Sequence, residues 1–356
     1  MKDLLILYVL FLIVITISCK KAQPDEVLPD NDPFKITPLL PLSDDVPYQL
    51  LGSGKILFER KYNPGGTVFY VIDADQKKSS GFKLNCQITQ PNISPQGNKI
   101  ACSLLNSANP KSNWNIYVMN IDGTDCYPVS PTDETANYPV WTKDGSKILY
   151  YTSGPEGGLY RLSAVENSSD REELIKFHSP ADPDWFIGPT GGFIFSTEGN
   201  LVGVSNSDKL CGIIGIKPFL GKDGVSILVS PKKDLDMASF VFRVESPVLS
   251  PDGLKIAFAL VYSNPFETTY FGLSLFTMKL DGTNLIQVGG ISVRQPINSQ
   301  TRSVSLCWSP DQTKILFTRP DPENSCNIYV VKLDGSGYFQ VTNQTNVFDS
   351  NVSWSR

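Results

Sequence analysis

One short pattern that recurs four times constrains this chain more than any other feature of its sequence. The four copies lie at Asn92–Cys102, Val140–Tyr150, Leu249–Phe258 and Cys307–Phe317. In most copies a hydrophobic run leads into a turn rich in Pro, Asp and Gly, and a Lys-Ile pair then opens a second hydrophobic run. Proline presets φ for a tight turn and glycine supplies a positive φ, so each copy predicts two strands joined by a turn. Gln312 replaces the glycine of the last copy, and we expect the turn there to be slightly strained or of another type.

A second motif follows three of these copies. It occurs at Asn115–Thr124, Ser274–Thr283 and Asn327–Ser336, and in each case side chains alternate before an Asp-Gly pair. Alternation predicts a strand, and Asp-Gly is a strong hairpin signal. Short runs after each Asp-Gly supply a fourth strand. Four strands in a unit of about 40 to 60 residues are typical of a β-propeller blade.

The two motifs together resemble the WD40-like (PD40) repeats of the TolB family, whose blades read W-S-P-D-G-x-K-I-A-F and then I-Y-V-x-N-x-D-G. The resemblance covers most of residues 51–356 and implies an all-β, TolB-like β-propeller. TolB proteins also carry a separate N-terminal domain, whereas a proline-rich segment occupies that place here.

The spacing of the second strands predicts six blades. These strands open at Lys55, Lys99, Lys147, Lys255 and Lys314. The gap between the third and fourth is about twice as long as its neighbours, so it needs one degraded blade. We place its first hairpin at Trp185–Phe195 and its third strand at Asn200–Ser205. The count becomes seven if Val225–Val229 and Phe240–Val244, within the least regular region (206–246), form a sheet of their own.

The two ends of the repeat region are complementary. Asn351–Arg356 reads as the first strand of a blade that stops at its turn, and Gly52–Phe58 reads as the missing second strand. We expect the C-terminal strand to pair with the N-terminal blade and so to close the propeller and remove free sheet edges.

The N-terminus resembles a bacterial lipoprotein signal. Leu4–Ile17 carries no charge and has the length of a signal-peptide core, and Ser18 precedes Cys19 as in a lipobox. We expect a signal peptide over 1–18, a lipidated Cys19, a proline-rich acidic tether over 19–50 and the propeller over 51–356. An ordinary signal peptide and an uncleaved anchor are the alternatives. All three place the propeller outside the cytoplasm.

Composition excludes several function classes. The net charge is -5 and basic residues occur in runs no longer than pairs, which disfavours nucleic acid as a partner. His178 is the single histidine, so multi-histidine metal sites, including the one implied by oligogalacturonate-lyase-like propellers, are excluded. No C-x-x-C spacing occurs, and no disulfide pairing is assigned. In strand-like runs, Cys102 and Cys307 read as small hydrophobic residues.

Motifs that suggest chemistry have simpler readings as turns. Gly52–Lys55 lacks the first glycine and the Ser/Thr of a phosphate loop. Asp122, Asp281 and Asp334 lie in hairpins too short to surround calcium. Asp182 and Asp184 read as solvated loop residues. We therefore expect no metal, no cofactor and no enzyme activity.

Connections between strands on one face of the ring hold most of the candidate binding residues. These connections are 106–114, 152–158, 261–273, 289–303, 319–326 and 343–350. The candidates, aromatic types enriched at binding hot spots, are Trp114, Tyr138, Tyr262, Phe266, Tyr270, Phe271 and Phe348.

The sequence thus predicts a monomeric, lipid-anchored interaction propeller of the bacterial cell envelope. Its anchor favours the outer membrane, with the propeller in the periplasm or at the cell surface, where the loop face binds an envelope protein. The alternative is a carbohydrate-binding or small-ligand propeller, hydrolytic in one version, that uses carboxylates in its channel.

Overall fold

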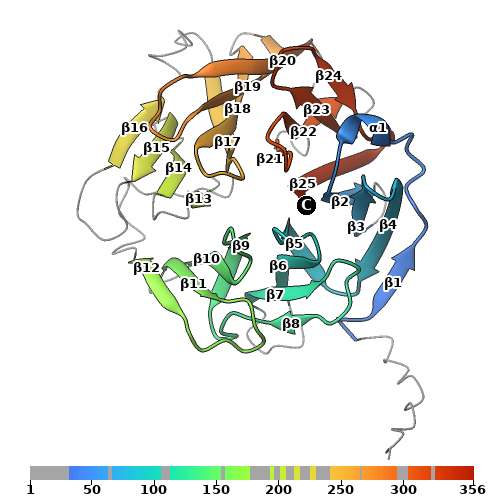
Figure 1. Cartoon of the computed structure of the whole chain (residues 1–356), viewed down its shortest axis with the longest axis vertical. Coiled ribbons are helices and arrows are strands. Elements are labelled where there is room, and N and C mark those ends of the chain that lie inside the picture. The colour runs from blue at the N-terminus through green and yellow to red at the C-terminus, as the bar shows by residue number, and fades with distance from the viewer. Residues whose placement is uncertain are drawn as a thin grey trace, which may run out of the picture.

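The computed structural model of the 356-residue chain is almost entirely β-strand. It describes residues 32–62, 66–105, 113–153, 157–176, 193–195, 201–205, 212–216, 225–229, 241–264, 267–294, 304–321 and 325–356. The helix in this described part is α1 (Tyr48–Leu51). Figure 1 shows the sheets arranged around a central axis. The all-β class predicted from the repeats is confirmed.

Four sheets each contain four strands that follow one another along the chain in antiparallel order. The first holds β5 (Gln87–Ile93), β6 (Lys99–Leu105), β7 (Trp114–Asn120) and β8 (Tyr127–Pro128). The second holds β9 (Thr135–Trp141), β10 (Lys147–Ser153), β11 (Gly158–Ser163) and β12 (Glu172–Lys176). The third holds β13 (Phe193–Phe195), β14 (Leu201–Ser205), β15 (Gly212–Ile216) and β16 (Val225–Val229). The fourth holds β17 (Val241–Leu249), β18 (Lys255–Asn264), β19 (Glu267–Lys279) and β20 (Ile286–Arg294).

A nine-stranded sheet contains both ends of the described chain. Its N-terminal strands are β1 (Ile36–Leu39), β2 (Lys55–Tyr62), β3 (Thr67–Asp73) and β4 (Lys78–Leu84). Its C-terminal strands are β21 (Leu306–Trp308), β22 (Lys314–Asp321), β23 (Ser325–Lys332), β24 (Tyr338–Gln340) and β25 (Val347–Ser355). As the sequence predicts, the last strand β25 pairs with β2, and Ile56 lies opposite Trp354. One parallel bridge between Cys326 and Phe348 joins β25 to β23.

The repeated turns adopt one conformation. Gly253 has φ +79°, and its N–H donates to the Ser250 carbonyl. Gln312, at the same position in the last copy, has φ +59° and donates to the Ser309 carbonyl in the same way. The strain expected at Gln312 is therefore present, because side chains with a Cβ disfavour this left-handed region.

The core lies between neighbouring sheets. The tryptophans of the first strands connect the sheets by hydrogen bonds as well as by packing. The indole N–H of Trp141 donates to the Asn92 carbonyl at 2.9 Å, and that of Trp308 donates to the Val248 carbonyl at 3.1 Å. Both tryptophans are 8% exposed or less, so the same residue type in two copies of the repeat connects adjacent sheets.

Residues 36–50 depart from the sequence prediction, which places them in the extended tether. β1 pairs antiparallel with β4, and Ile36 lies opposite Leu84. Val46 is buried in the same core cluster as β2 and β3. The tether prediction is wrong for this part. Its composition predicts solvated residues, but Asp44 forms a buried ion pair with Arg60, and β1 pairs with the edge of β4.

The degraded blade also differs from its predicted layout. Phe193–Phe195 is the first strand of its sheet, and Leu201–Ser205 is the second strand rather than the third. Val225–Val229 is the outer strand of this sheet, and Val241–Leu249 opens the next one. These two segments therefore form no sheet of their own. Without the Pro-Asp-Gly turn, the repeat offers no marker that fixes which strand comes first.

Candidate interaction surface

The structure places most of the predicted aromatic residues in strands rather than loops. Trp114 is the first residue of β7 and is half-buried. Tyr138 lies in the middle of β9 and Tyr262 near the end of β18, and both are half-buried. Tyr270 and Phe271 belong to β19. Phe266 lies outside the described residues, as do Cys19, His178, Asp182 and Asp184.

Phe348 is a core residue and not part of an exposed loop. It lies in β25 opposite Lys61, and its side chain is 7% exposed. The predicted loops 261–273 and 343–350 are wrong in part. β18 and β19 occupy 261–264 and 267–273, and β25 occupies 347–350, because residues there pair with neighbouring strands, whereas 343–346 lies outside the strands.

The fourth sheet extends further than its neighbours at the connection between its second and third strands. β6 and β18 both begin at the lysine of the repeat, but β6 has 7 residues and β18 has 10. β19 has 13 residues and pairs with β20 as far as Arg294. At about 3.3 Å per residue, three more residues lengthen the sheet by roughly 10 Å. We call residues 262–272 and 291–294 the sheet extension.

Tyr262 anchors the base of the sheet extension. It lies opposite Gly272 across the β18–β19 ladder. A Cβ on Gly272 would come within 2.1 Å of the Tyr262 ring, so the ring covers the space left by the glycine. This contact gives the extension a rigid base, because a large ring and a glycine on opposing strands fit one another.

A ring of strained residues lies on the strands nearest the axis. Gln90, Tyr138, Ser246 and Asn351 occupy equivalent positions, and each has φ between +47° and +57°. Gln90 accepts a hydrogen bond from the Tyr138 N–H, and the Asn351 N–H donates to Ser305 Oγ at 3.0 Å. These bonds join first strands of neighbouring sheets, so the strain serves contacts between sheets. No turn motif marks these residues in the sequence, although Gln90, Tyr138 and Ser246 lie at one distance from the glycine of the repeat turn that follows each.

Two carboxylates on the first two strands of their sheets bear on the sequence alternative, which uses carboxylates in the channel. Glu59, on β2, accepts a hydrogen bond from Asn351 Nδ2 at 2.6 Å, and burial raises its pKa. Glu245, on β17, accepts from the Val304 N–H at 3.0 Å and is 1% exposed. Both carboxylates are hydrogen-bonded within the protein and lie on different sheets.

A buried ionic cluster was missed by sequence reasoning. Arg60 donates to Asp44 at 2.8 Å and to Asp349 at 2.7 Å, and all three side chains are at most 1% exposed. The Arg60 guanidinium lies 5.5 Å from the ring centroid of Phe58 and 5.6 Å from that of Tyr70. Burial raises the pKa of Asp349 and outweighs the lowering effect of Arg60. The only sequence signal is a charged residue at a core-facing position of β2, two after Phe58.

Two half-buried versions of this arrangement occur elsewhere in the described structure. Arg319 donates to Asp321 at 2.6 Å and lies 4.0 Å from the Tyr329 ring centroid. Arg171 pairs with Glu134 at 2.8 Å and lies 3.6 Å from the Tyr160 ring centroid. Each carboxylate has a cationic partner, so these clusters hold strands together rather than present a free acid or base.

The aspartates of the hairpins are turn residues, as predicted. The Thr124 N–H donates to Asp122 Oδ1 at 3.0 Å, and the Ser336 N–H donates to Asp334 Oδ1 at 2.8 Å. The Gly54 N–H donates to Asp75 while Lys55 Nζ donates to the Gly97 carbonyl, so Gly52–Lys55 is a turn as well. Within the described residues, no three His, Cys, Asp or Glu side chains form a metal-binding group.

The described cysteines are thiols, and Cys102 is buried in β6, as its sequence context predicts. Burial raises the pKa of Cys86 and of Cys126 to about 12. The low thiolate fraction near neutral pH gives neither residue the reactivity of a catalytic cysteine. In the described part of the chain, no helix has the length and apolar character to cross a membrane.

The fold and these sites define an all-β propeller whose polar groups mostly connect its own sheets. No protein-family model and no curated protein matches the sequence. Among solved structures, TolB from Acinetobacter baumannii has a TM-score of 0.60 and 14% identity and covers 85% of this chain. The match spans 66% of the TolB chain, just under two thirds. The resemblance to TolB read from the repeats is therefore confirmed for the fold.

Enzymes share the same architecture. Hydrazine synthase from Kuenenia stuttgartiensis has a TM-score of 0.55 with 13% identity, over 85% of this chain and 46% of its own. An oligogalacturonate lyase in complex with manganese has a TM-score of 0.49 with 10% identity, over 87% of this chain and 84% of its own. At these identities the likeness concerns the fold alone, and activity has to be argued from the sites.

Proposed function

We propose that the chain is a non-enzymatic interaction propeller of the bacterial cell envelope that binds a protein partner through the sheet extension. In this proposal the propeller has six blades and is closed by β25 on β2. With six blades, the nine-stranded sheet holds two of them, and the parallel bridge between Cys326 and Phe348 lies at the boundary between these two blades. The protein is monomeric and needs no cofactor.

The sheet extension is the observation that carries this proposal. It lengthens one sheet, and it brings Tyr262 on β18 and Tyr270 and Phe271 on β19 into one pair of strands. Aromatic side chains supply much of the binding energy at protein interfaces. The inner carboxylates and the arginine clusters, in contrast, are engaged within the protein.

The binding test replaces residues 263–271 by Asn-Gly, which keeps a two-residue hairpin turn. The matched control replaces residues 106–113, the corresponding connection between the paired residues Leu105 of β6 and Trp114 of β7, by the same dipeptide. Each full-length protein serves as bait in a cross-linking pull-down from intact cells. We expect a specific envelope protein with the unaltered chain and the control, and its loss when 263–271 is replaced. Equal recovery from all three proteins would contradict the proposal.

Anchoring through Cys19 is a separate part of the proposal. Ser18-Cys19 after an uncharged run supports lipidation, and an acyl chain adds about 0.8 kcal/mol of membrane affinity per buried CH₂. Residues 20–35 then connect the anchor to β1 at the outer edge of the nine-stranded sheet. Cys19→Ser should move the protein from the membrane fraction to the soluble fraction and remove the mass of the lipid. An unchanged membrane fraction would rule out this anchor, and the outer membrane is tested by separating the membranes by density.

A further inference from the structure

The outermost strands of the sheets differ greatly in length. Apart from β4 and β20, the outer strands of the described sheets have 2 to 5 residues. β4 has 7 residues and β20 has 9. Short outer strands limit the backbone groups that a passing chain can pair with. β4 and β20 are thus the two long outer edges of the described sheets.

The edge of β4 is covered by the chain itself. β1 adds to it in antiparallel register from Ile36–Leu84 to Leu39–Gly81. β1 contains Pro38, and prolines 33 and 41 flank it, so this new edge has few N–H groups to offer. In this sheet an extended segment, β1, is thus added to a long outer strand, and the prolines limit further pairing at the new edge.

The edge of β20 has neither a covering strand among the described residues nor a proline. Among the described residues, no strand pairs with its outer side, and β19 pairs with its inner side. Residues 286–294 contain no proline and one charged residue, Arg294. Long edges without proline or several charges are templates for strand addition. Its last four residues, 291–294, belong to the sheet extension.

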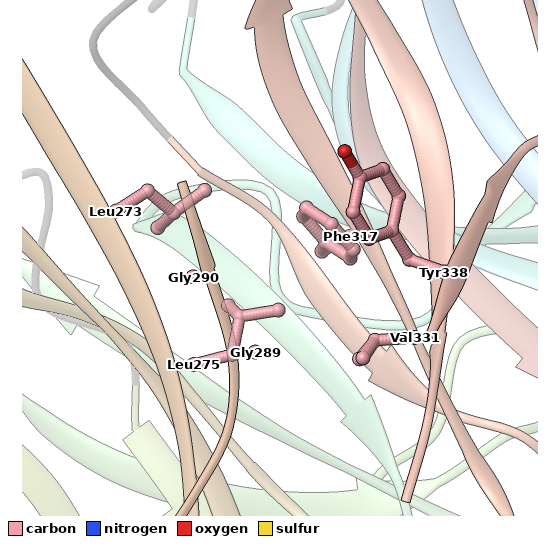
Figure 2. A pocket seen from close by; sticks show the side chains of 7 residues that line it. All are labelled: Leu273, Leu275, Gly289, Gly290, Phe317, Val331 and Tyr338. Atoms are coloured by element: carbon pink, nitrogen blue, oxygen red, sulfur yellow. The ribbon is translucent and has the colours of Figure 1, made fainter. Parts of the chain in front are cut away.

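An apolar groove lies beside β20. Figure 2 shows Leu273, Leu275 and Gly289 on one side, and Phe317, Val331 and Tyr338 on the other. Its enclosed part has a volume of about 10 Å³, which is the space of about one water molecule. The groove is thus too small for a sugar or a cofactor. It can receive the tip of an aliphatic side chain from a segment that runs along β20.

We propose that the outer edge of β20 binds an extended, alternately apolar segment of a partner protein, which joins the sheet as an additional strand. The proposal rests on the proposed function, since it specifies how a partner engages the sheet extension. Backbone hydrogen bonds to β20 would supply affinity, and the groove would select the side chains that face it. The partner segment would pair with β20 in the way that β1 pairs with β4 within this chain.

The first test uses two adjacent proline substitutions, Ile291→Pro and Ser292→Pro. Neighbouring residues of an antiparallel strand direct their N–H groups to opposite sides, so one substitution removes an outward N–H and the other a bond to β19. A melting temperature within roughly 2 °C of the unaltered protein identifies the outward position. The probe is a phage-displayed library of random linear peptides selected on the full-length protein.

We expect the selected peptides to lose at least about tenfold in affinity for the outward proline variant, because one or more backbone hydrogen bonds are lost. In the unaltered protein, the same peptides should slow hydrogen exchange of alternate amides within 286–294. This measurement needs no variant, so it holds even if both proline variants unfold. Peptides that bind the outward variant equally well, or protect other residues, would overturn the proposal, and so would a selection that enriches none.

Two further outcomes separate this inference from the proposed function. Peptides that lose binding when 263–271 is replaced, but not with the outward proline, would preserve the partner-binding extension and reject strand addition. A dimer in sedimentation that the outward proline converts to a monomer would assign the edge to a second copy of this chain and reject the partner segment.

Discussion

At the scale of single residues, Arg60 has the most consequential environment in the described structure. Its guanidinium meets Asp44 from the N-terminal segment and Asp349 from β25, so one side chain joins parts of the chain that are far apart in sequence. The Asn343 N–H donates to Asp44 at 2.7 Å, and Thr342 Oγ1 donates to Asp349 at 2.7 Å. Hydrogen bonds from the protein thus replace those of water at the two buried carboxylates, and a buried charge is unfavourable without such partners.

Substitution of Arg60 by Met should destabilise the protein by about 3 to 5 kcal/mol, because two carboxylates would remain buried without their cation. The free energy of unfolding in urea measures this effect. Lys61→Met serves as the matched control, since Lys61 is the exposed neighbour on the same strand, and we expect a change below about 0.5 kcal/mol there. Similar losses of unfolding free energy in both variants would show that the ionic cluster contributes little to stability.

The turn aspartates predict a dependence of stability on pH. Hydrogen bonds from Thr142 and Ser146 lower the pKa of Asp144 to about 2. The folded-state pKa lies below the unfolded-state value, so the stabilisation is complete above about pH 4 and is lost as the pH falls to about 2. Asp144→Asn should lose less stability than the unaltered protein over this interval. Urea unfolding at several pH values measures how the free energy of unfolding changes with pH. The double variant Thr142→Val with Ser146→Ala should also weaken this pH dependence. An equal pH dependence in all three proteins would contradict the stabilising role of the Asp144 carboxylate.

At the scale of elements, the N-terminal segment 36–51 belongs to the propeller although it precedes the first repeat. β1 covers the edge of β4, Val46 is 8% exposed, and Leu51 at the end of α1 is 1% exposed. Hydrogen bonds from Arg60 and the Asn343 N–H fix Asp44 between β2 and the segment before β25. The proposed tether therefore ends before β1, and residues 36–51 are part of the fold.

A chain that begins at Leu51 should be less stable than one that begins at Asp32. Loss of Asp44 leaves Arg60 with one carboxylate, and loss of β1 exposes the edge of β4. We expect a difference of about 3 kcal/mol or more, or roughly 10 °C in melting temperature. Thermal unfolding of the two chains measures it. Equal melting temperatures would restore the boundary at residue 51 that the repeats alone suggest.

At the scale of the whole molecule, the contact between the two chain ends determines whether the described sheets form a closed ring. Figure 1 places the C-terminus close to the central axis. The Trp354 indole N–H donates to the Ser53 carbonyl at 3.0 Å, and its ring is 8% exposed. A Cβ on Gly97 would lie 2.0 Å from the Arg356 carbonyl, so the end of the chain packs tightly against the β5–β6 turn.

Deletion of Val352–Arg356 should abolish cooperative unfolding of the propeller. The deletion removes the buried side chains of Trp354 and Val352, and the loss of one buried side chain of this size already costs about 2 to 5 kcal/mol. It also exposes about half of the β2 edge. Arg356→Ala is the control, because it keeps the backbone at the chain end and removes only an exposed side chain, and it should have little effect. Calorimetry of the two variants measures the transition. A sharp transition near the unaltered melting temperature in the deletion variant would show that β25 does not close the ring.

Local chemistry by itself determined most of the architecture. The Pro-Asp-Gly turns and the period-two alternation specify where strands begin and pair, because turn conformation and side-chain alternation depend on neighbouring residues. The structure therefore has the predicted hairpins at Ser250 and Ser309, and β25 pairs with β2 as the sequence predicts. The resemblance to TolB rests on the same local signals and holds for the fold.

Only the tertiary structure decided which residues are buried and which remain available to a partner. Asp44 reads as part of a solvated tether until Arg60, on another element, supplies its counter-charge. Phe348 reads as a surface aromatic until the β2 ladder extends to it. Among the described strands, the long edge of β20 without an outer partner becomes evident only by comparison with β4 and its covering strand. Burial and exposure depend on contacts between distant segments, and a local pattern carries no information about which segments meet.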